Sequence, residues 1–441
     1  MSDNFAATRV RALSVRDIRF PTSLENTCPS EQHPDPDYSC AYVTLFTDTD
    51  LRGHGLCFTL GRGTELVVSA VKSLARLVVG RPLSKLLYGN MRATWHSLVS
   101  ESQLRWVGPE KGVVHLAVGA VVNALWDLWA RLERVPLWKL LVDMDPQVLV
   151  STIDFTYITD ALTEQEALQM LQQMQEGKQE RENFMLKNGY PAYTTAAGWI
   201  EYSDEKIRTK CEQFLARGWR HFKLKVGLDL QRDKERCRLV RDIIGFCRPL
   251  WIEEPTSPDD ILGHATIADA LRPLGIGVAT GEACQNRVVF KQLLQAKAID
   301  FCQIDACRVG GVSEVLAIYL MAKKFNVPVC PHAGGVGLCQ MVQHLQMWDY
   351  VSLTGTTKNR VIEYVPHLEE HFKTQINVTN CRYFPPKIPG YSVEMWAKSL
   401  QDYEYPAGPA WKKLYAEGKF PDPAMEKCPL VERPIERISK R

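Results

Sequence analysis

The feature that most constrains the fold is a regular alternation of short β-rich runs and helical stretches in the second half of the chain. Helices are predicted between the runs, at 204–217, 229–244, 260–271, 287–295 and 313–325. The predicted strands are the runs 194–199, 221–226, 250–254, 277–282, 301–305, 327–332 and 350–354. Such alternation is typical of parallel βαβ units, so we predict an α/β fold, a (β/α) TIM-type barrel.

The first part of the chain has a different pattern. Period-two runs at 12–20, 40–47 and 55–60 predict antiparallel strands, and a helical period follows from 64 to 130. These residues predict an α+β domain over 1–150. Three further segments are predicted after this domain. Residues 151–191 form a helical excursion that includes a capping box at Thr163 and Glu166. Residues 192–380 form the barrel, and the Pro-rich segment 381–441 packs back on the first domain.

Composition excludes several classes of protein. Lys plus Arg is 53 and Asp plus Glu is 51, a balance that gives no basic surface for nucleic acid or an anionic membrane. No run approaches the ~18 apolar residues of a membrane span. The 13 Cys include no C-x-x-C, which favours a reducing compartment over a disulfide scaffold or zinc ribbon. Gly275–Gly281 has the wrong spacing for a dinucleotide site.

Ionisable residues end most of the predicted strands. In a parallel barrel such residues converge at one mouth and are read as catalytic. Lys223 and Lys225 share a strand face, and a buried lysine beside another cation and a metal has a lowered pKa suited to a base. The alternative interpretation of this pair is two surface lysines whose side chains extend into solvent. The other members of this set are Glu253, Glu282, Asp305, His332 and, a few residues beyond the last run, Glu363.

Two pairs suggest specific chemistry. Glu253 and Glu282 suit an oxygen-seeking cation such as Mg²⁺, with solvated loop or helix-capping carboxylates as the alternative. Asp305 could orient and charge the His332 imidazole for acid–base work, with a structural histidine as the alternative. No role is assigned to three histidines read as solvated: His344, His367 and His371.

At these residues the sequence resembles the enolase superfamily, mandelate racemase subgroup. The likeness runs through nearly the whole chain, and its motifs stand in the family's order. They are Tyr38, the Trp126-Asp-Leu-Trp helix, Lys223-Leu-Lys225, 251–260, Thr280-Gly-Glu282, 303–306, 308–311, 331–339 and Glu363.

The resemblance implies an α+β capping domain over a modified (β/α)₇β barrel. It also implies Mg²⁺-dependent dehydration of an acid sugar through an enediolate, with L-fuconate as the first expected substrate. It makes Lys225 the base and His332, oriented by Asp305, the acid. The metal ligands would be Glu253 and Glu282, and the substrate contacts Lys223, Tyr38, Glu282, Glu363, Ala333 and Gly334. By analogy the protein is a mitochondrial homo-oligomer, with the cytoplasm as the alternative compartment.

One departure from the family stands out. Relatives take three metal carboxylates from three successive strands, and the first, an Asp, should lie between Lys225 and Glu253. Those residues are only 28 apart, and the interval holds one helix and no Asp-Ala-Asn run. Seven β-runs also fall short of the eight that a closed barrel needs.

We therefore predict that one βα unit is absent, which leaves two strand edges exposed unless the flanking strands pair. No nearby carboxylate is expected to replace the Asp, since Asp242 is helical and Asp259 and Asp260 lie beyond the strand end. The alternative function is a catalytically impaired isoform or paralogue that keeps the fold without a complete metal site.

Overall fold

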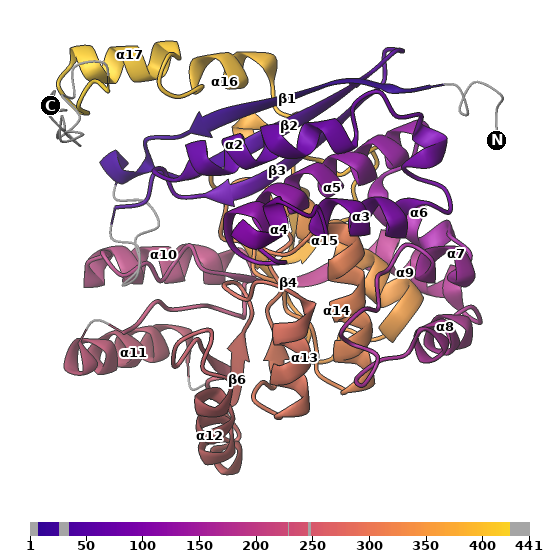
Figure 1. The fold of residues 1–441 in the computed structure, drawn as a ribbon. Coiled ribbons are helices and arrows are strands. Elements are labelled where there is room, and N and C mark those ends of the chain that lie inside the picture. Colours follow the sequence, from indigo (N-terminus) through magenta and orange to yellow (C-terminus); the bar gives the residue numbers. More distant parts are fainter. Residues whose placement is uncertain (1–7, 26–34, 228, 246–247, 424–441) are drawn as a thin grey trace, which may run out of the picture.

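The computed structural model describes residues 8–25, 35–227, 229–245 and 248–423 of the 441. Figure 1 shows a layer of strands and helices from the N-terminal part lying above a second body of strands surrounded by helices. The strands are β1 (Val10–Arg19), β2 (Ser39–Thr47), β3 (Arg52–Thr59), β4 (Tyr190–Thr194), β5 (Trp251–Glu253), β6 (Gly277–Thr280), β7 (Phe301–Cys302), β8 (Ile362–Tyr364), β9 (Val378–Thr379) and β10 (Arg382–Tyr383).

The α-helices vary from one to about six turns. They are α2 (Thr64–Leu74), α3 (Met91–Val99), α4 (Leu104–Val107), α5 (Gly112–Leu132), α6 (Leu137–Asp143), α7 (Pro146–Val150), α8 (Glu164–Gln173), α9 (Lys178–Asn188), α10 (Asp204–Ala216), α11 (Leu230–Ile244), α12 (Ile261–Leu271), α13 (Arg287–Gln295), α14 (Val312–Lys324), α15 (Leu338–Trp348), α16 (Ala397–Asp402) and α17 (Pro409–Ala416).

The N-terminal layer is an antiparallel sheet in the order β1-β2-β3, with α2 and α5 packed on it. Gly55 in β3 allows the close contact with α5, because a Cβ atom there would lie 2.3 Å from the carbonyl oxygen of Ala120. By length and composition α5 could cross a membrane, but 89% of its most apolar window is buried inside the protein. It is therefore packed as a core helix.

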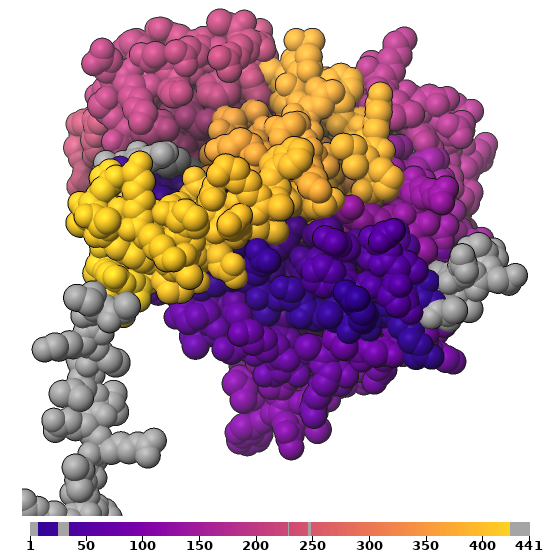
Figure 2. Space-filling view, turned by 90° about the horizontal axis from the view of Figure 1, so that it is seen from above, coloured from indigo at the N-terminus to yellow at the C-terminus, as the bar shows by residue number. Residues whose placement is uncertain are grey.

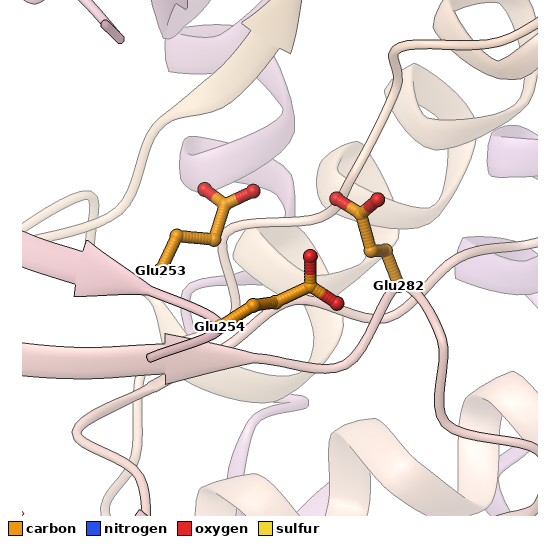
Figure 3. A group of neighbouring side chains, drawn as sticks. All are labelled: Glu253, Glu254 and Glu282. Carbon is orange, nitrogen blue, oxygen red and sulfur yellow. The ribbon is translucent and has the colours of Figure 1, made fainter. Parts of the chain in front are cut away.

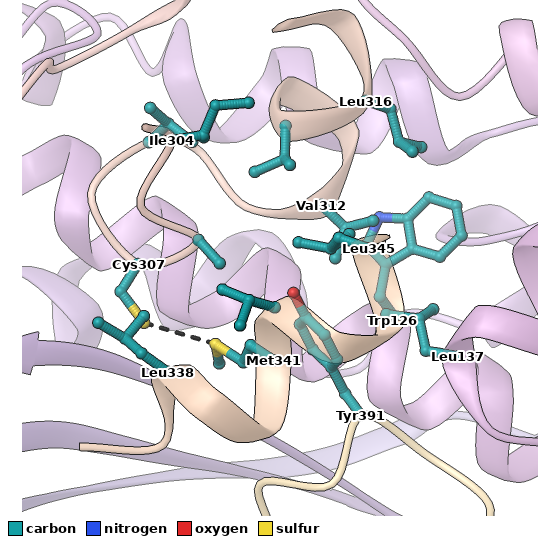
Figure 4. Packing of buried hydrophobic residues seen from close by; sticks show 14 of the residues in the cluster. Trp126, Leu137, Ile304, Cys307, Val312, Leu316, Leu338, Met341, Leu345 and Tyr391 are labelled. Atoms are coloured by element: carbon teal, nitrogen blue, oxygen red, sulfur yellow. Dashed lines mark hydrogen bonds between the residues drawn. The ribbon is translucent and has the colours of Figure 1, made fainter. Parts of the chain in front are cut away.

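The core continues from this layer into the second body. Figure 4 shows side chains of α5, α14 and α15 packed together with Tyr391 from the C-terminal part. The indole Nε1 of Trp126 in α5 donates to Ser313 Oγ of α14 at 3.1 Å, and both residues are buried. Because one cluster spans both layers, the two bodies are held together by continuous apolar packing.

The barrel strands of the second body are parallel and form two groups, and the hairpin of β9 and β10 pairs antiparallel with the start of β4. In one, β8 pairs with β4, and β4 continues to Phe222 through a parallel bridge at Thr194. In the other, β5, β6 and β7 pair in that order, and Cys302 continues to Val329. A separate apolar cluster fills the space between the groups, formed by Tyr193, Ala279, Phe301, Cys330 and Val361 with Trp251 against it. This cluster is the interior of a barrel-like body.

The barrel-like body is open where the sequence predicts a missing unit. Among the described residues, no pairing joins the segment at 221–226 to β5. Val226, Leu250 and Ile252 beside the gap are 41%, 41% and 39% exposed. Ile252 lies between two inward-facing residues of β5, so its side chain points to the side that a helix would otherwise cover. The flanking strands therefore do not close over the gap.

Several predicted elements differ from the structure. The run at 350–354 is wrong as a strand, because it continues α15 as a helical segment, and Glu363 lies in a strand of its own, β8. In a short run buried on all sides, the spacing of apolar residues cannot distinguish a strand from a helix, which explains the error. The strand predicted at 194–199 lies earlier, at Tyr190–Thr194. The five helices predicted between strands are confirmed to within one residue at either end.

The C-terminal segment lies along the N-terminal sheet. Backbone hydrogen bonds join Arg19 to Tyr403 and Tyr405 to Asp17, and the Trp411 indole donates to the Arg19 carbonyl at 3.1 Å. Figure 2 shows this segment, in yellow, lying against the indigo N-terminal part. These contacts attach the C-terminal segment of the described chain to the layer that contains β1.

Candidate active site

The two lysines of the segment at 221–226 lie at the mouth of the barrel-like body. Lys223 Nζ donates to Glu253 Oε1 at 2.5 Å and lies 3.5 Å from Glu363 Oε1. Burial alone would lower the pKa of Lys223, but the carboxylates of Glu253 and Glu363 outweigh it and raise that pKa. Lys223 is therefore held as a cation, contrary to the expectation of a lowered pKa.

Lys225 lies near the same carboxylates without pairing to one. In the described part of the chain its ammonium makes no hydrogen bond, yet it acts on the pKa of Glu253 and Glu254. Burial alone would raise the pKa of Glu253, and the ammonium groups of Lys223 and Lys225 outweigh it and hold that pKa well below its usual range. Glu253 is thus ionised, with an uncommitted amine nearby.

His332 and Asp305 form the pair that the sequence suggests. His332 Nδ1 lies 2.8 Å from Asp305 Oδ2, and Asp305 Oδ1 accepts from the backbone N–H groups of Cys307 and Arg308. His332 Nε2 lies 3.7 Å from Glu282 Oε2. Burial alone would lower the pKa of His332, but Glu282 and Asp305, aided by more distant carboxylates, outweigh it and raise the pKa to about 9. The imidazole is protonated at neutral pH.

Glu363 joins the loop after His332 to the lysines. Its Oε1 accepts from Thr195 Oγ1, and its Oε2 accepts from the backbone N–H of Ala333 at 2.8 Å. Gly334 packs beside both groups, since a Cβ atom there would lie 3.0 Å from His332 Nε2 and 3.9 Å from Glu363 Oε2. The predicted contacts Glu363, Ala333 and Gly334 are therefore brought together around the imidazole.

Tyr38 lies one layer further out. It precedes β2, is 5% exposed, and packs edge-on against Phe58 at 5.2 Å between ring centroids. Phe58 in turn meets Gly335, where a Cβ atom would lie 2.7 Å from its ring. Tyr38 thus stands on the N-terminal layer, facing the loop that follows His332.

Three carboxylates converge at the mouth, one more than the sequence predicts. Oxygen atoms of Glu253, Glu254 and Glu282 all lie within 4.8 Å of one another (Figure 3). Burial first, and then the charges of Glu282 and Glu253, raise the pKa of Glu254 to about 7. The expectation that no nearby carboxylate could replace the missing Asp is therefore wrong.

Glu254 was missed because neighbours on a regular strand point to opposite faces. Here the strand ends at Glu253, and Glu254 has a φ of 47°, a left-handed conformation that returns its side chain to the side of Glu253. The Glu-Glu doublet before a proline was the available signal. Two more polar contacts were also missed: Gln303, which donates to Glu253 Oε2 at 2.8 Å, and Thr195 on Glu363.

The three histidines without an assigned role are not solvated. His344 is fully buried, with Nδ1 accepting from the backbone N–H of Trp138 at 3.1 Å and Nε2 at 2.8 Å from Ser392 Oγ. His371 is 9% exposed and stacks on Phe20. His367 is partly buried and packs edge-on against Tyr38. The sequence reading of these residues as solvated is wrong, because their helix and loops are covered by neighbouring segments.

The carboxylate group fits a magnesium ion by its chemistry. All its donors are oxygen atoms, the ligands that Mg²⁺ prefers. Glu282 Oε2 is shielded from solvent and has no hydrogen-bond partner among the described residues, so one member of the group carries an unsatisfied acceptor. These residues could hold a hard divalent cation together with water.

Comparisons with known proteins agree with this architecture. Residues 21–142 match the family "Mandelate racemase / muconate lactonizing enzyme, N-terminal domain", and 246–399 match "Enolase C-terminal domain-like". The chain is 56% identical to human mitochondrial enolase superfamily member 1 over 434 residues, covering 92% of this chain and 98% of that one. It is 49% identical to L-galactonate dehydratase of Hypocrea jecorina over 427 residues, covering 90% and 94%.

Solved structures show the same fold. The crystal structure of the human relative superposes with a TM-score of 0.90, over the same shares of the two chains. L-talarate/galactarate dehydratase from Salmonella typhimurium LT2, liganded with Mg and L-lyxarohydroxamate, gives 0.68 at 19% identity, over 90% of this chain and 94% of that one. An N-terminal capping domain and a C-terminal barrel-like domain are thus shared features. The chain belongs to the enolase superfamily, in its mandelate racemase and muconate lactonizing enzyme subgroup.

Proposed function

We propose that this chain is a Mg²⁺-dependent acid-sugar dehydratase that converts L-fuconate to 2-keto-3-deoxy-L-fuconate. The observation that carries the proposal is the meeting of an unpaired lysine, a charged His–Asp pair and a carboxylate group at one mouth. An acid sugar has a weakly acidic C2 hydrogen and a poor leaving group at C3. A base, an acid and positive charge near the sugar carboxylate are what its dehydration requires.

The residues divide the proton transfers between them. Lys225, in its neutral form, takes the proton from C2, and His332 Nε2 donates one to the 3-hydroxyl, which leaves as water. The resulting enol tautomerises to the 2-keto acid. Lys223 polarises the sugar carboxylate, and Glu363 holds Lys223 and the backbone of Ala333 in place. Asp305 keeps the imidazole charged and oriented. Bound Mg²⁺, held by Glu253 and Glu282, supplies positive charge to that carboxylate.

The substrate class is supported by the relatives. One relative at 49% identity is an L-galactonate dehydratase. L-Fuconate differs from L-galactonate only by the missing hydroxyl at C6, so both acids present the same stereochemistry at C2 and C3. The contacts proposed for the sugar are Tyr38, Ala333 and Gly334, together with Lys223, Glu282 and Glu363. The proposed compartment, the mitochondrion, follows the name of the human relative. A homo-oligomeric assembly is proposed by analogy with the family.

For the fold we propose a modified (β/α)₇β barrel that is one βα unit short. Ninety-two per cent of 441 residues is about 406, so about 28 of the 434 positions aligned with the human relative have no counterpart here. That number suits one βα unit, and the gap beside β5 is where its strand would lie. The proposed boundaries are a cap at 1–150, a helical excursion at 151–191, a barrel at 192–380 and a C-terminal segment at 381–441.

The open barrel favours a second candidate, a homologue that keeps the fold with impaired catalysis. The purified chain, incubated with Mg²⁺ and either L-fuconate or L-galactonate, separates the two by release of the 2-keto-3-deoxy acid. Turnover that disappears in the His332→Asn variant supports the dehydratase. Absence of product from both acids, with a cooperative thermal melt, supports the impaired homologue.

A further inference from the structure

We infer that Glu254 is the third carboxylate of the cation site, replacing an aspartate that this chain lacks. The inference rests on the proposed Mg²⁺ dependence and deepens it. The site would draw two carboxylates from the end of one strand, Glu253 and Glu254, and one from the next, Glu282. In Figure 3 the three carboxylates point into a common space.

The backbone holds Glu254 in this position. Its N–H donates to the Ala279 carbonyl of β6 at 3.0 Å, so the residue remains attached to the neighbouring strand although β5 has ended. The φ of 47° then directs the side chain to the inner side, beside Glu253. Glu282 follows β6, so the paired strands fix the separation of all three carboxylates.

Acceptor atoms at the same place lack donors. Gln303 is 1% exposed, and its Nε2 donates to Glu253 while its Oε1 has no partner among the described residues. Glu282 Oε2 is likewise shielded from solvent and has no hydrogen-bond partner among the described residues, its nearest charged partner being His332 Nε2 at 3.7 Å. Burying an acceptor unsatisfied is unfavourable. One such oxygen atom within the three carboxylates and another on Gln303, which donates to one of them, indicate a missing positive partner, a cation with its water shell.

The ion pairs leave a matching charge deficit. Lys223 pairs with Glu253 and Glu363, and His332 pairs with Asp305. Among the described residues Glu254 has no ion pair, and Glu282 has only the 3.7 Å contact with His332. Lys225, the remaining cation nearby, forms no ion pair with either carboxylate among the described residues, so one divalent ion would neutralise both.

Binding of Mn²⁺ to the full chain, without substrate, tests the assignment. Titration calorimetry and the electron paramagnetic resonance signal of free Mn²⁺ both report the dissociation constant. Glu254→Gln keeps the shape and removes the charge, and Glu254→Ala serves if that variant does not fold. Glu282→Gln is the reference for a lost ligand. Asp259→Asn is the matched control, because Asp259 is an exposed carboxylate only five residues away.

We expect the dissociation constant to rise at least tenfold in Glu254→Gln, as in Glu282→Gln, and to stay within twofold in Asp259→Asn. A normal constant in Glu254→Gln together with a weakened Glu282→Gln would overturn the role of Glu254 and leave the proposed function standing. No Mn²⁺ binding by the unaltered chain would overturn both.

Discussion

At the scale of single residues, the site depends on which charges are paired and which are not. Lys223 is committed to two carboxylates, whereas Lys225, two residues on, makes no hydrogen bond through its ammonium in the described part of the chain. Only an amine that is not already held as an ion-pair partner can shed its proton without breaking a buried contact. The same short segment thus carries one lysine suited to hold charge and one suited to accept a proton.

The Lys225→Ala variant should separate these roles. We expect exchange of the C2 hydrogen of L-fuconate with D₂O, followed by proton NMR, to fall by a factor of about 10² to 10⁴, the usual contribution of a positioned base. The melting temperature should change little, because no hydrogen bond of the ammonium is lost. Exchange at the unaltered rate would show that another group removes the proton.

The sequence predicts which residues meet at this site better than it predicts their side-chain directions and pKa values. Residues at strand ends could be placed at one mouth because parallel strands share a direction. The direction of the Glu254 side chain could not be predicted, since it depends on one backbone torsion after the strand, which the Glu-Glu doublet before a proline does not specify. The pKa of Lys223 was also beyond reach, because it depends on the distance to Glu253.

At the scale of elements, α15 shows how burial changes a side chain's role. Its sequence has polar residues on several faces, which suggests a solvated helix, yet the whole helix is buried. His344 satisfies both ring nitrogens, binding the start of α6 through Trp138 and the C-terminal part through Ser392. A neutral imidazole is required there, since Nδ1 must keep a lone pair to accept the Trp138 N–H.

Stability should therefore fall in mild acid. Burial lowers the pKa of His344 from 6.5 to about 3. The unfolded chain takes up this proton below pH 6.5 and the folded chain does not, so the contribution is complete above that pH and declines as pH falls toward 3. Between pH 7.5 and 5 we expect a loss of about 2 kcal/mol from this residue.

Urea unfolding at the two pH values measures this loss. The His344→Asn variant is the comparison: it should be less stable at both pH values, with the difference between them smaller by about the same 2 kcal/mol. An equal difference in variant and parent would mean that other groups account for the acid sensitivity.

At the scale of the whole molecule, the gap beside β5 is the main departure from a closed barrel. The sequence predicts the gap, because the spacing between Lys225 and Glu253 is too short for another strand and helix. The sequence could not show whether the flanking strands would re-pair, since that depends on how far the surrounding helices can move. The structure leaves them apart, with Val226, Leu250 and Ile252 about 40% exposed.

Restoring the missing unit should fill the gap beside β5. Insertion of the corresponding segment of the human relative after Gly245 would supply a strand for the two edges and a helix over Ile252. Covering the three apolar side chains should add roughly 1 kcal/mol each to the free energy of unfolding, and binding of the dye anilinonaphthalene sulfonate should fall. A Gly/Ser linker of equal length at the same point is the control. The resemblance to the family implies a first metal aspartate in this unit, so the chimera should bind Mn²⁺ normally even with Glu254→Gln. Continued dependence on Glu254, in a chimera whose dye binding has fallen, would mean that Glu254 serves the closed barrel as well as the open one.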